Sequence, residues 1–284
     1  MTLAERSLYN LRMPFAIALG RFSRRPPRYP RLPWRRWALA CLALALAGFF
    51  LLDPIVGGYH GKWPGMLARI AGKSTKLGVG TWYLVPPALV LLFANLVDWR
   101  ALSRRRLMLL YNWTSLGFFV LGGAGISGGT VLLLKNIIGR ARPANFVTLG
   151  DLSFRPLAFD VPFASFPSGH ATIVGAVAAI LVLFLPRWKY LVLPLAVWVA
   201  ATRMFVGAHY PSDIVVGFGA GFGFTVALAV LFARLGFLFG QRPAALPVVR
   251  KTFHLLPRRQ DQDRPYRSRF GRGSASSPAS RRSR

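Results

Sequence analysis

Long apolar stretches, each close to the length of a membrane-crossing helix, constrain most strongly how this chain can fold. Hydrophobic residues make up 54% of its 284 positions, and about 20 apolar residues suffice to cross the hydrocarbon core of a bilayer. Backbone N–H and C=O groups in lipid must be satisfied within the protein, which permits only helices or closed barrels. Runs this long and apolar predict helices. We therefore expect an all-α, polytopic membrane protein built as a six-transmembrane-helix bundle.

The limits of the apolar stretches define six predicted spans. Their approximate ranges are 37–52, 78–97, 107–134, 170–185, 190–208 and 214–232. Pro86-Pro87 is expected to kink the second span, and glycines at alternate positions from Gly217 to Gly223 predict close packing of the sixth. The predicted domains are a basic cytoplasmic N-terminal segment (1–36), the transmembrane domain (37–234) and a basic, largely disordered cytoplasmic tail (235–284).

Positive charge is concentrated outside the apolar stretches. The formal net charge is +29, and residues 1–36 alone hold nine arginines. In a soluble protein this charge would suggest a nucleic-acid partner, whereas basic flanks of membrane proteins mark the cytoplasmic side and bind anionic lipid headgroups. We therefore expect cytoplasmic termini that bind anionic headgroups, and no nucleic-acid partner. The outer loops are then 54–77, 135–169 and 209–213.

Three short polar segments interrupt the apolar chain and hold most of its reactive side chains. They are Lys135 with Arg142-Pro143, then Pro167-Ser168-Gly169-His170, then Arg203 with His209 and Asp213. The whole chain has only four histidines and eight acidic residues. Ionisable groups at membrane depth are costly and are usually functional. Because the predicted topology places all three segments on the same outer face, they predict an active site there.

Two of these segments carry signals of helix starts. Ser168 is a candidate N-cap, and the unpaired N–H groups and dipole of the helix that follows attract anions. Pro211 suits a first helical turn, so Asp213 is expected to reach back to His209 and fix its tautomer. Each signal alone also has a purely structural explanation as a helix cap.

Together the segments suit a phosphate group. Lys135 and Arg142 are seven residues apart, which would place them on one stripe of a helix, roughly 10 Å apart along its axis. Cations and amide groups stabilise the charge on phosphoryl oxygens during attack at phosphorus. The carboxylate of Asp213 favours His209 as the activated nucleophile, which leaves His170 as the general acid.

The order and spacing of these residues resemble the type 2 phosphatidic acid phosphatase family of membrane lipid phosphatases. Lys135 with Arg142-Pro143 matches its first motif, Pro167 to His170 its second, and Thr202-Arg203, His209 and Asp213 its third, where Thr202 replaces a serine. The resemblance covers about residues 37–234. It implies a phosphohistidine at His209, proton donation by His170, and no metal or other cofactor. It also implies phosphate binding by Lys135, Arg142, Ser168, Gly169 and Arg203.

Other functions are weighed against this one. His170, His209 and Asp213 imitate a two-histidine, one-carboxylate metal site, but three nearby cations would repel a divalent ion. A serine hydrolase using Ser168 would lack the nucleophile elbow. A lipid phosphotransferase would share the first half-reaction, and a non-catalytic lipid transporter or scaffold would not need intact motif residues.

We therefore expect a metal-independent enzyme that hydrolyses a phosphate monoester or diphosphate on a membrane lipid. Candidate substrates are undecaprenyl diphosphate, phosphatidylglycerophosphate, phosphatidate and the phosphates of lipid A. The expected location is a bacterial inner membrane, with the active site facing the periplasm or exterior. The sequence carries no readable code that ranks these lipids.

Overall fold

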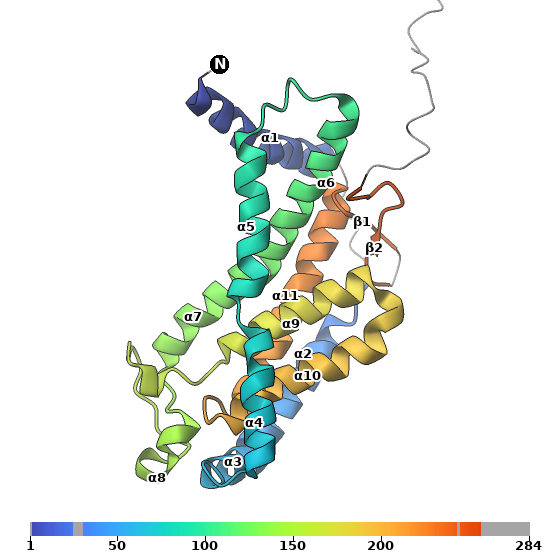
Figure 1. Cartoon of the computed structure of the whole chain (residues 1–284). Coiled ribbons are helices and arrows are strands. Elements are labelled where there is room, and N and C mark those ends of the chain that lie inside the picture. Colours follow the sequence, from blue (N-terminus) through green and yellow to red (C-terminus); the bar gives the residue numbers. More distant parts are fainter. Residues whose placement is uncertain (1, 25–30, 243–244, 257–284) are drawn as a thin grey trace, which may run out of the picture.

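Helices form nearly all the regular structure of the computed structural model, which describes residues 2–24, 31–242 and 245–256 (Figure 1). They are α1 (Leu3–Arg24), α2 (Trp34–Ala47), α3 (Asp53–Gly58), α4 (Gly65–Ser74), α5 (Thr81–Leu96), α6 (Arg104–Val120), α7 (Ser127–Ile138), α8 (Phe146–Leu149), α9 (Gly169–Phe184), α10 (Lys189–Phe205) and α11 (Pro211–Leu235). A small antiparallel hairpin, β1 (Phe239–Gly240) with β2 (Val248–Val249), follows α11. The predicted helical class is confirmed, with this hairpin added to it.

Four helical stretches are long and apolar enough to cross a membrane. They are Trp34–Gly58, Gly65–Leu96, Arg104–Ile138 and Pro211–Leu235. Helices α9 and α10 pass the same test only as a pair that bends by 120°. With 16 residues, α9 is about 24 Å long, shorter than the roughly 30 Å hydrocarbon core. The described residues thus contain four candidate spans, or five if the bent pair counts as one, and the predicted number of six is not confirmed.

The region predicted as the first outer loop is largely helical. Within 54–77 the structure forms most of α3, all of α4 and part of a 3-10 turn, Thr75–Gly78, that joins α4 to α5. The second span therefore begins at Gly65, well before the predicted start near Gly78. The basic residues of α4 lower its mean hydropathy, so hydropathy alone did not predict this helix, although its leucine, alanine and methionine favour helix.

Glycines on α11 let two helices approach it closely, as predicted. A Cβ on Gly217 would lie 2.4 Å from the backbone oxygen of Ser168, and one on Gly221 would lie 1.9 Å from another backbone oxygen of α9. Gly219 instead lies against Cys41 of α2. The close α9–α11 contact brings the start of α9, and with it the second polar segment, against α11.

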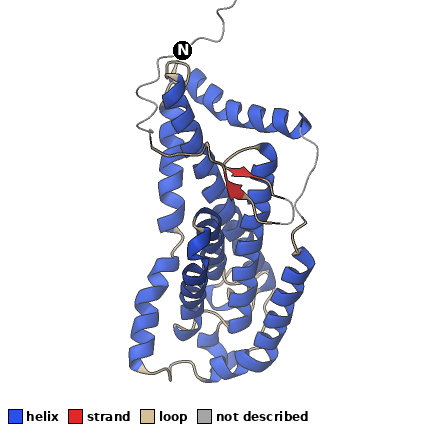
Figure 2. Cartoon of the chain, turned by 90° about the vertical axis from the view of Figure 1, so that its right-hand side faces the viewer, coloured by secondary structure: helices blue, strands red, loops and turns tan. Residues whose placement is uncertain are grey.

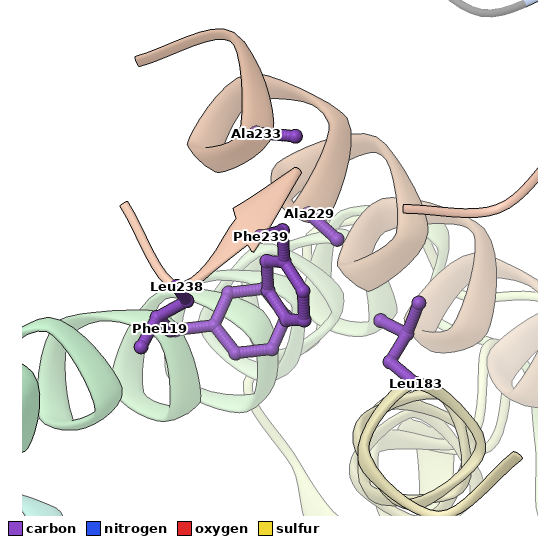
Figure 3. Close-up of a cluster of buried hydrophobic side chains, with 6 residues drawn as sticks. All are labelled: Phe119, Leu183, Ala229, Ala233, Leu238 and Phe239. Carbon is purple, nitrogen blue, oxygen red and sulfur yellow. The ribbon is translucent and has the colours of Figure 1, made fainter. Parts of the chain in front are cut away.

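The chain beyond α11 folds back onto the apolar core. Phe239 of β1 is fully buried, and its ring meets that of Phe119 edge to face at 4.9 Å (Figure 3). Leu183 of α9 and Ala229 of α11 complete the contact. Residues 237–240, which the prediction places in the largely disordered tail (235–284), therefore belong to the packed structure. Residues 257–284 of that tail lie outside the described residues.

Helix α1 crosses one end of the bundle (Figures 1 and 2). The side-chain amide of Asn10 donates to the backbone oxygens of Asn95 and Val97, at 2.9 and 2.8 Å. Arg21 donates to the hydroxyl of Tyr111 at 2.8 Å. These contacts fix α1 to the end of α5 and to the middle of α6, while the binding of lipid headgroups by the basic N-terminal segment stays a prediction.

Candidate functional site

The second and third polar segments meet where α9 and α11 begin. The hydroxyl of Ser168 accepts a hydrogen bond from the N–H of Ala171 at 3.3 Å, which confirms Ser168 as the N-cap of α9. Its own N–H donates to the backbone oxygen of Asp213 at 3.1 Å. Gly169 is the first residue of α9, so the unpaired N–H groups of this helix start lie beside the third segment.

The first polar segment reaches the site through a loop and not along a helix. Helix α7 ends at Ile138, and Gly139 follows with φ +64° in the left-handed region that glycine tolerates best. Arg142 is extended, as a residue before proline usually is. The predicted helical stripe joining Lys135 to Arg142 is therefore wrong, yet the two side chains lie close enough for their charges to interact.

His209, in the connection between α10 and α11, is held by a backbone carbonyl. Its Nδ1 lies 2.7 Å from the backbone oxygen of Ser165, and only 5% of the residue is exposed. An Nδ1–H donated to this carbonyl leaves the lone pair on Nε2. The nearest oxygen of Asp213 is 3.9 Å from Nδ1, too far for a hydrogen bond. Ser165, and not Asp213 as predicted, fixes the tautomer.

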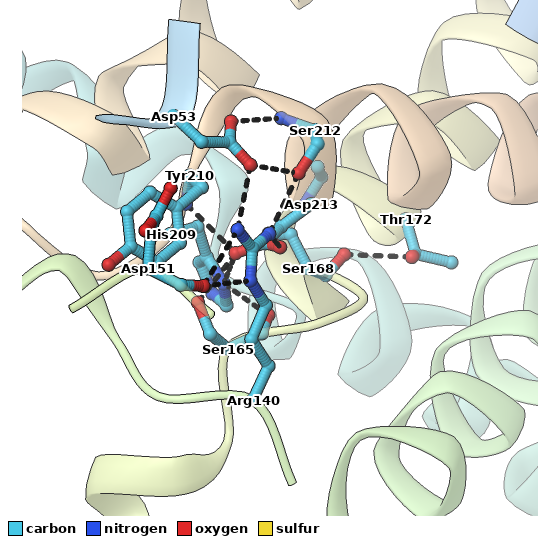
Figure 4. A network of polar contacts seen from close by, with 11 residues as sticks. Asp53, Arg140, Asp151, Ser165, Ser168, Thr172, His209, Tyr210, Ser212 and Asp213 are labelled. Atoms are coloured by element: carbon cyan, nitrogen blue, oxygen red, sulfur yellow. Dashed lines mark hydrogen bonds and ion pairs between the residues drawn. The ribbon is translucent and has the colours of Figure 1, made fainter. Parts of the chain in front are cut away.

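Both oxygens of Asp213 are occupied by other donors. Oδ1 accepts from Arg140 at 2.7 Å, and Oδ2 accepts from the N–H of Tyr210 at 2.8 Å and from the hydroxyl of Ser165 (Figure 4). The carboxylate therefore lies in the first turn of α11, as predicted. Its link to His209 runs through Ser165, whose hydroxyl donates to Asp213 and whose backbone oxygen lies against Nδ1 of His209.

Arg140 and Asp53 were missed by sequence reasoning. Arg140 bridges Asp213 and Asp53, and all three are buried. A signal was available, because Asp53 is one of only eight acidic residues and ends an apolar stretch. A carboxylate in that position needs a cationic partner, although the sequence does not say which of the many arginines supplies it.

Each of the three polar segments contributes one buried polar atom that has no protein partner among the described residues. These atoms are Nε of Arg142, Nε of Arg203 and Nε2 of His170. Arg203 is oriented by one contact, from its Nη1 to the hydroxyl of Thr75 at 3.1 Å. Buried donors require acceptors, and guanidinium groups match the oxygens of phosphate particularly well.

The 3-10 turn between α4 and α5 forms a further wall of the site. Besides Thr75, it supplies Gly78, where a Cβ would lie only 2.1 Å from Nε2 of His170. Glycine at this position leaves the space that the imidazole occupies. No sequence motif marked the turn, which straddles the predicted boundary between the first outer loop (54–77) and the second span (78–97).

Gly78→Ala is expected to lower kcat by roughly tenfold or more, because the added methyl displaces the His170 ring and such misplacement is costly. Gly72→Ala is the matched control, since a Cβ at Gly72 meets nothing within 4 Å. Phosphate release, the activity expected from the sequence, is measured for the two purified variants. Equal, undiminished rates would show that Gly78 does not shape the site.

The environment of His209 favours its neutral form. Burial lowers the pKa of His209 well below its usual 6.5, and the positive charges of Arg203 and Arg142 lower the pKa further. The hydrogen bond to Ser165 acts in the opposite direction, and the charge of His170 adds to the lowering. A neutral imidazole keeps the Nε2 lone pair that a nucleophile needs.

His209 is therefore expected to remain neutral in the folded protein as the pH falls below its unfolded pKa of about 6.5. The unfolded chain takes up a proton there and the folded chain does not, so this group makes the folded state less stable as pH falls through that range. Nitrogen NMR of imidazole-labelled protein, assigned with His209→Ala, measures the titration. A His209 midpoint at or above 6.5 would contradict the expectation.

A metal centre is not built from these side chains. Within residues 2–24, 31–242 and 245–256, no group of three or more His, Cys, Asp or Glu is arranged to hold a metal ion. The alternative site of His170, His209 and Asp213 therefore has no support from the geometry.

Comparison with known proteins identifies a family and several named relatives. The model of the PAP2 superfamily matches residues 115–237. A protein named lipid A 1-phosphatase from Rhizobium johnstonii is 34% identical over 227 residues, which cover 79% of this chain and 91% of that protein. An undecaprenyl-diphosphatase from Sulfolobus acidocaldarius is 38% identical over 84 residues, covering 29% of this chain and 39% of that protein.

A solved structure is also similar. It is the crystal structure of a transmembrane PAP2 type phosphatidylglycerolphosphate phosphatase from Bacillus subtilis, with 22% identity and a TM-score of 0.42. The match covers 68% of this chain and 92% of that one.

Proposed function

Since this chain belongs to the PAP2 superfamily and its relatives are lipid phosphatases, we propose that it hydrolyses a lipid phosphate through a phosphohistidine at His209. One observation carries the mechanism. The Nδ1 of His209 lies against the carbonyl of Ser165, so Nε2 is left as the nucleophile. Unpartnered donors of Arg142, Arg203 and His170 belong to the same site.

In the first half-reaction, Nε2 of His209 attacks phosphorus and forms a P–N bond. The P–O bond to the lipid breaks, and protonated His170 gives its proton to the departing lipid oxygen. Arg142, Arg203, Lys135 and the N–H groups at the start of α9 stabilise the negative charge on the phosphoryl oxygens. The positive charge left on the phosphorylated ring lies 3.9 Å from the Asp213 carboxylate.

In the second half-reaction, water attacks the phosphohistidine. Neutral His170 accepts a proton from this water, the P–N bond breaks, and inorganic phosphate leaves with His209 restored. No metal ion or cofactor takes part in either step. Microscopic reversibility gives His170 the roles of acid and base in turn.

Among candidate substrates, we place the phosphate of lipid A first. The relative of that name aligns over most of both chains, whereas the undecaprenyl-diphosphatase aligns over less than a third of this one. Undecaprenyl diphosphate, phosphatidylglycerophosphate and phosphatidate are the further candidates. The proposed setting is a bacterial inner membrane, with six spans, cytoplasmic termini that bind anionic headgroups, and an outward-facing site.

Two other functions share parts of this geometry. A phosphotransferase would pass the phosphoryl group from His209 to a second lipid in place of water. A non-catalytic transporter or scaffold would bind the lipid phosphate without forming the P–N bond. The experiment below separates all three.

Purified protein in detergent, with a chelator present, is expected to release inorganic phosphate from at least one lipid of this panel, and fastest from lipid A. Phosphorus NMR follows both products, so transfer to a second lipid is seen as a new lipid phosphate. Activity that disappears with the chelator and returns with a divalent ion would refute the metal-free mechanism. Binding with no turnover of any panel lipid would favour the scaffold.

A further inference from the structure

A buried ion network connects the first span to the catalytic histidine. Arg140, on the loop after α7, is 1% exposed, and its two carboxylate partners are fully buried. It donates to Asp53 at 2.8 Å and to Asp213 at 2.7 Å. One guanidinium thereby ties α3 to the first turn of α11 (Figure 4).

The position of Arg140 is set from several sides. Its Nη1 also donates to the hydroxyl of Ser212 at 2.8 Å, and its Nε donates to the backbone oxygen of Asp151 at 3.3 Å. The guanidinium carbon lies 4.3 Å from the ring centroid of Tyr210. Asp53 in turn accepts from the N–H of Ser212 at 3.1 Å. The bridge therefore has one defined geometry.

Ser165 links this bridge to His209. Its hydroxyl donates to Asp213, and its backbone oxygen is the partner of Nδ1 of His209. With Arg140 on Oδ1, the carboxylate of Asp213 is held 3.9 Å from the imidazole and does not compete for Nδ1–H. The order of contacts is Asp53, Arg140, Asp213, Ser165 and His209.

We propose that Asp53 and Arg140 are positioning residues for His209. They keep the Asp213 carboxylate hydrogen-bonded to the Ser165 hydroxyl, so that the Ser165 carbonyl selects the Nδ1–H tautomer of His209. The kinetic consequence rests on the proposed function, whereas the tautomer does not. Removing one member of a buried ion pair leaves an uncompensated charge, so the remaining carboxylates would seek other donors. Asp53 lies outside residues 115–237, where the family model matches. The first candidate span, Trp34–Gly58, which holds Asp53, is then part of the site's support.

A double-mutant cycle tests the order of contacts. Arg140→Gln is expected to lower kcat by about 100-fold with little change in KM, and Asp53→Asn by about tenfold, because small displacements of reacting groups are this costly. Since Asp53 acts through Arg140, the double variant is expected to match Arg140→Gln alone. Additive losses would overturn the proposed order. Arg140→Lys, which keeps the charge, is expected to recover part of the rate.

A second readout does not depend on catalysis. The chain has only four histidines, so nitrogen NMR of imidazole-labelled protein resolves the tautomer of His209, which faces Arg142, Arg203 and His170. Wild type is expected to show the Nδ1–H form, and Arg140→Gln is expected to lose it. Arg155→Gln on the same loop is the matched control, because its ion pair with Asp160 is exposed, and it should change neither readout.

The outcomes separate this proposal from the proposed function. If the tautomer depends on Arg140 but no phosphohistidine forms, the positioning role stands and the phosphatase mechanism fails. If phosphohistidine forms, but neither the His209 tautomer nor kcat changes when Asp53 or Arg140 is substituted, the positioning role is wrong. If size exclusion shows that Arg140→Gln does not fold, the double-mutant cycle is measured with Arg140→Lys and Asp53→Asn instead.

Discussion

His209→Ala is expected to lower phosphate release by at least about 10⁴-fold, because removal of a catalytic nucleophile leaves only the residual effect of binding. The variant should also form no phosphoenzyme. Substrate binding should persist, since Arg142, Arg203 and the start of α9 are untouched. Rates with radiolabelled lipid phosphate, measured in the same detergent, give the comparison.

His254→Ala is the control for this change, because His254 lies near the C-terminal end of the described residues and contributes only its backbone oxygen to a hydrogen bond with Asn112. It should retain the wild-type rate. If His209→Ala turns over lipid as fast as this control, the nucleophile has been assigned to the wrong residue.

His170→Gln is expected to slow hydrolysis of lipid phosphate by about 10²- to 10⁴-fold, the usual contribution of a general acid. The loss should be much smaller for p-nitrophenyl phosphate, whose leaving group departs without a proton. This dependence on the leaving group distinguishes proton donation from a purely structural role. Initial rates with both substrates, on matched preparations, measure it.

An equal loss with both substrates would contradict the acid role of His170 in the first half-reaction. It would instead point to slow hydrolysis of the phosphohistidine, where His170 acts as the base. A burst of nitrophenol before steady turnover separates that case, because the first half-reaction would then remain fast.

Residues whose roles depend on local geometry could be predicted from the sequence. Ser168 as an N-cap and Asp213 in the first turn of α11 follow from residue type and nearby proline or glycine. The alternate glycines of α11 likewise predicted close helix contacts. These features depend on neighbours a few residues away, which a single sequence displays.

Features that depend on distant partners could not be predicted in the same way. The spacing of His209 and Asp213 predicts contact between an i, i+4 pair, but the carboxylate of Asp213 accepts hydrogen bonds from Arg140 and Ser165 instead. Asp53 and Arg140 are 87 positions apart, and no residue near either of them in the sequence indicates that they form an ion pair. The predicted start of the second span was wrong for a related reason. Hydropathy alone does not distinguish a loop from a basic helix such as α4.

The most direct test of the central claim is to locate the covalent phosphate. Protein mixed briefly with labelled lipid phosphate is quenched in two parallel samples, one in alkali, where phosphohistidine survives, and one in acid, where phosphoserine survives. Both samples are then digested and analysed by mass spectrometry. The proposed mechanism predicts phosphate on the peptide that contains His209, and none in His209→Ala. Phosphate on Ser168 or His170, or turnover with no phosphopeptide at any time, would contradict it.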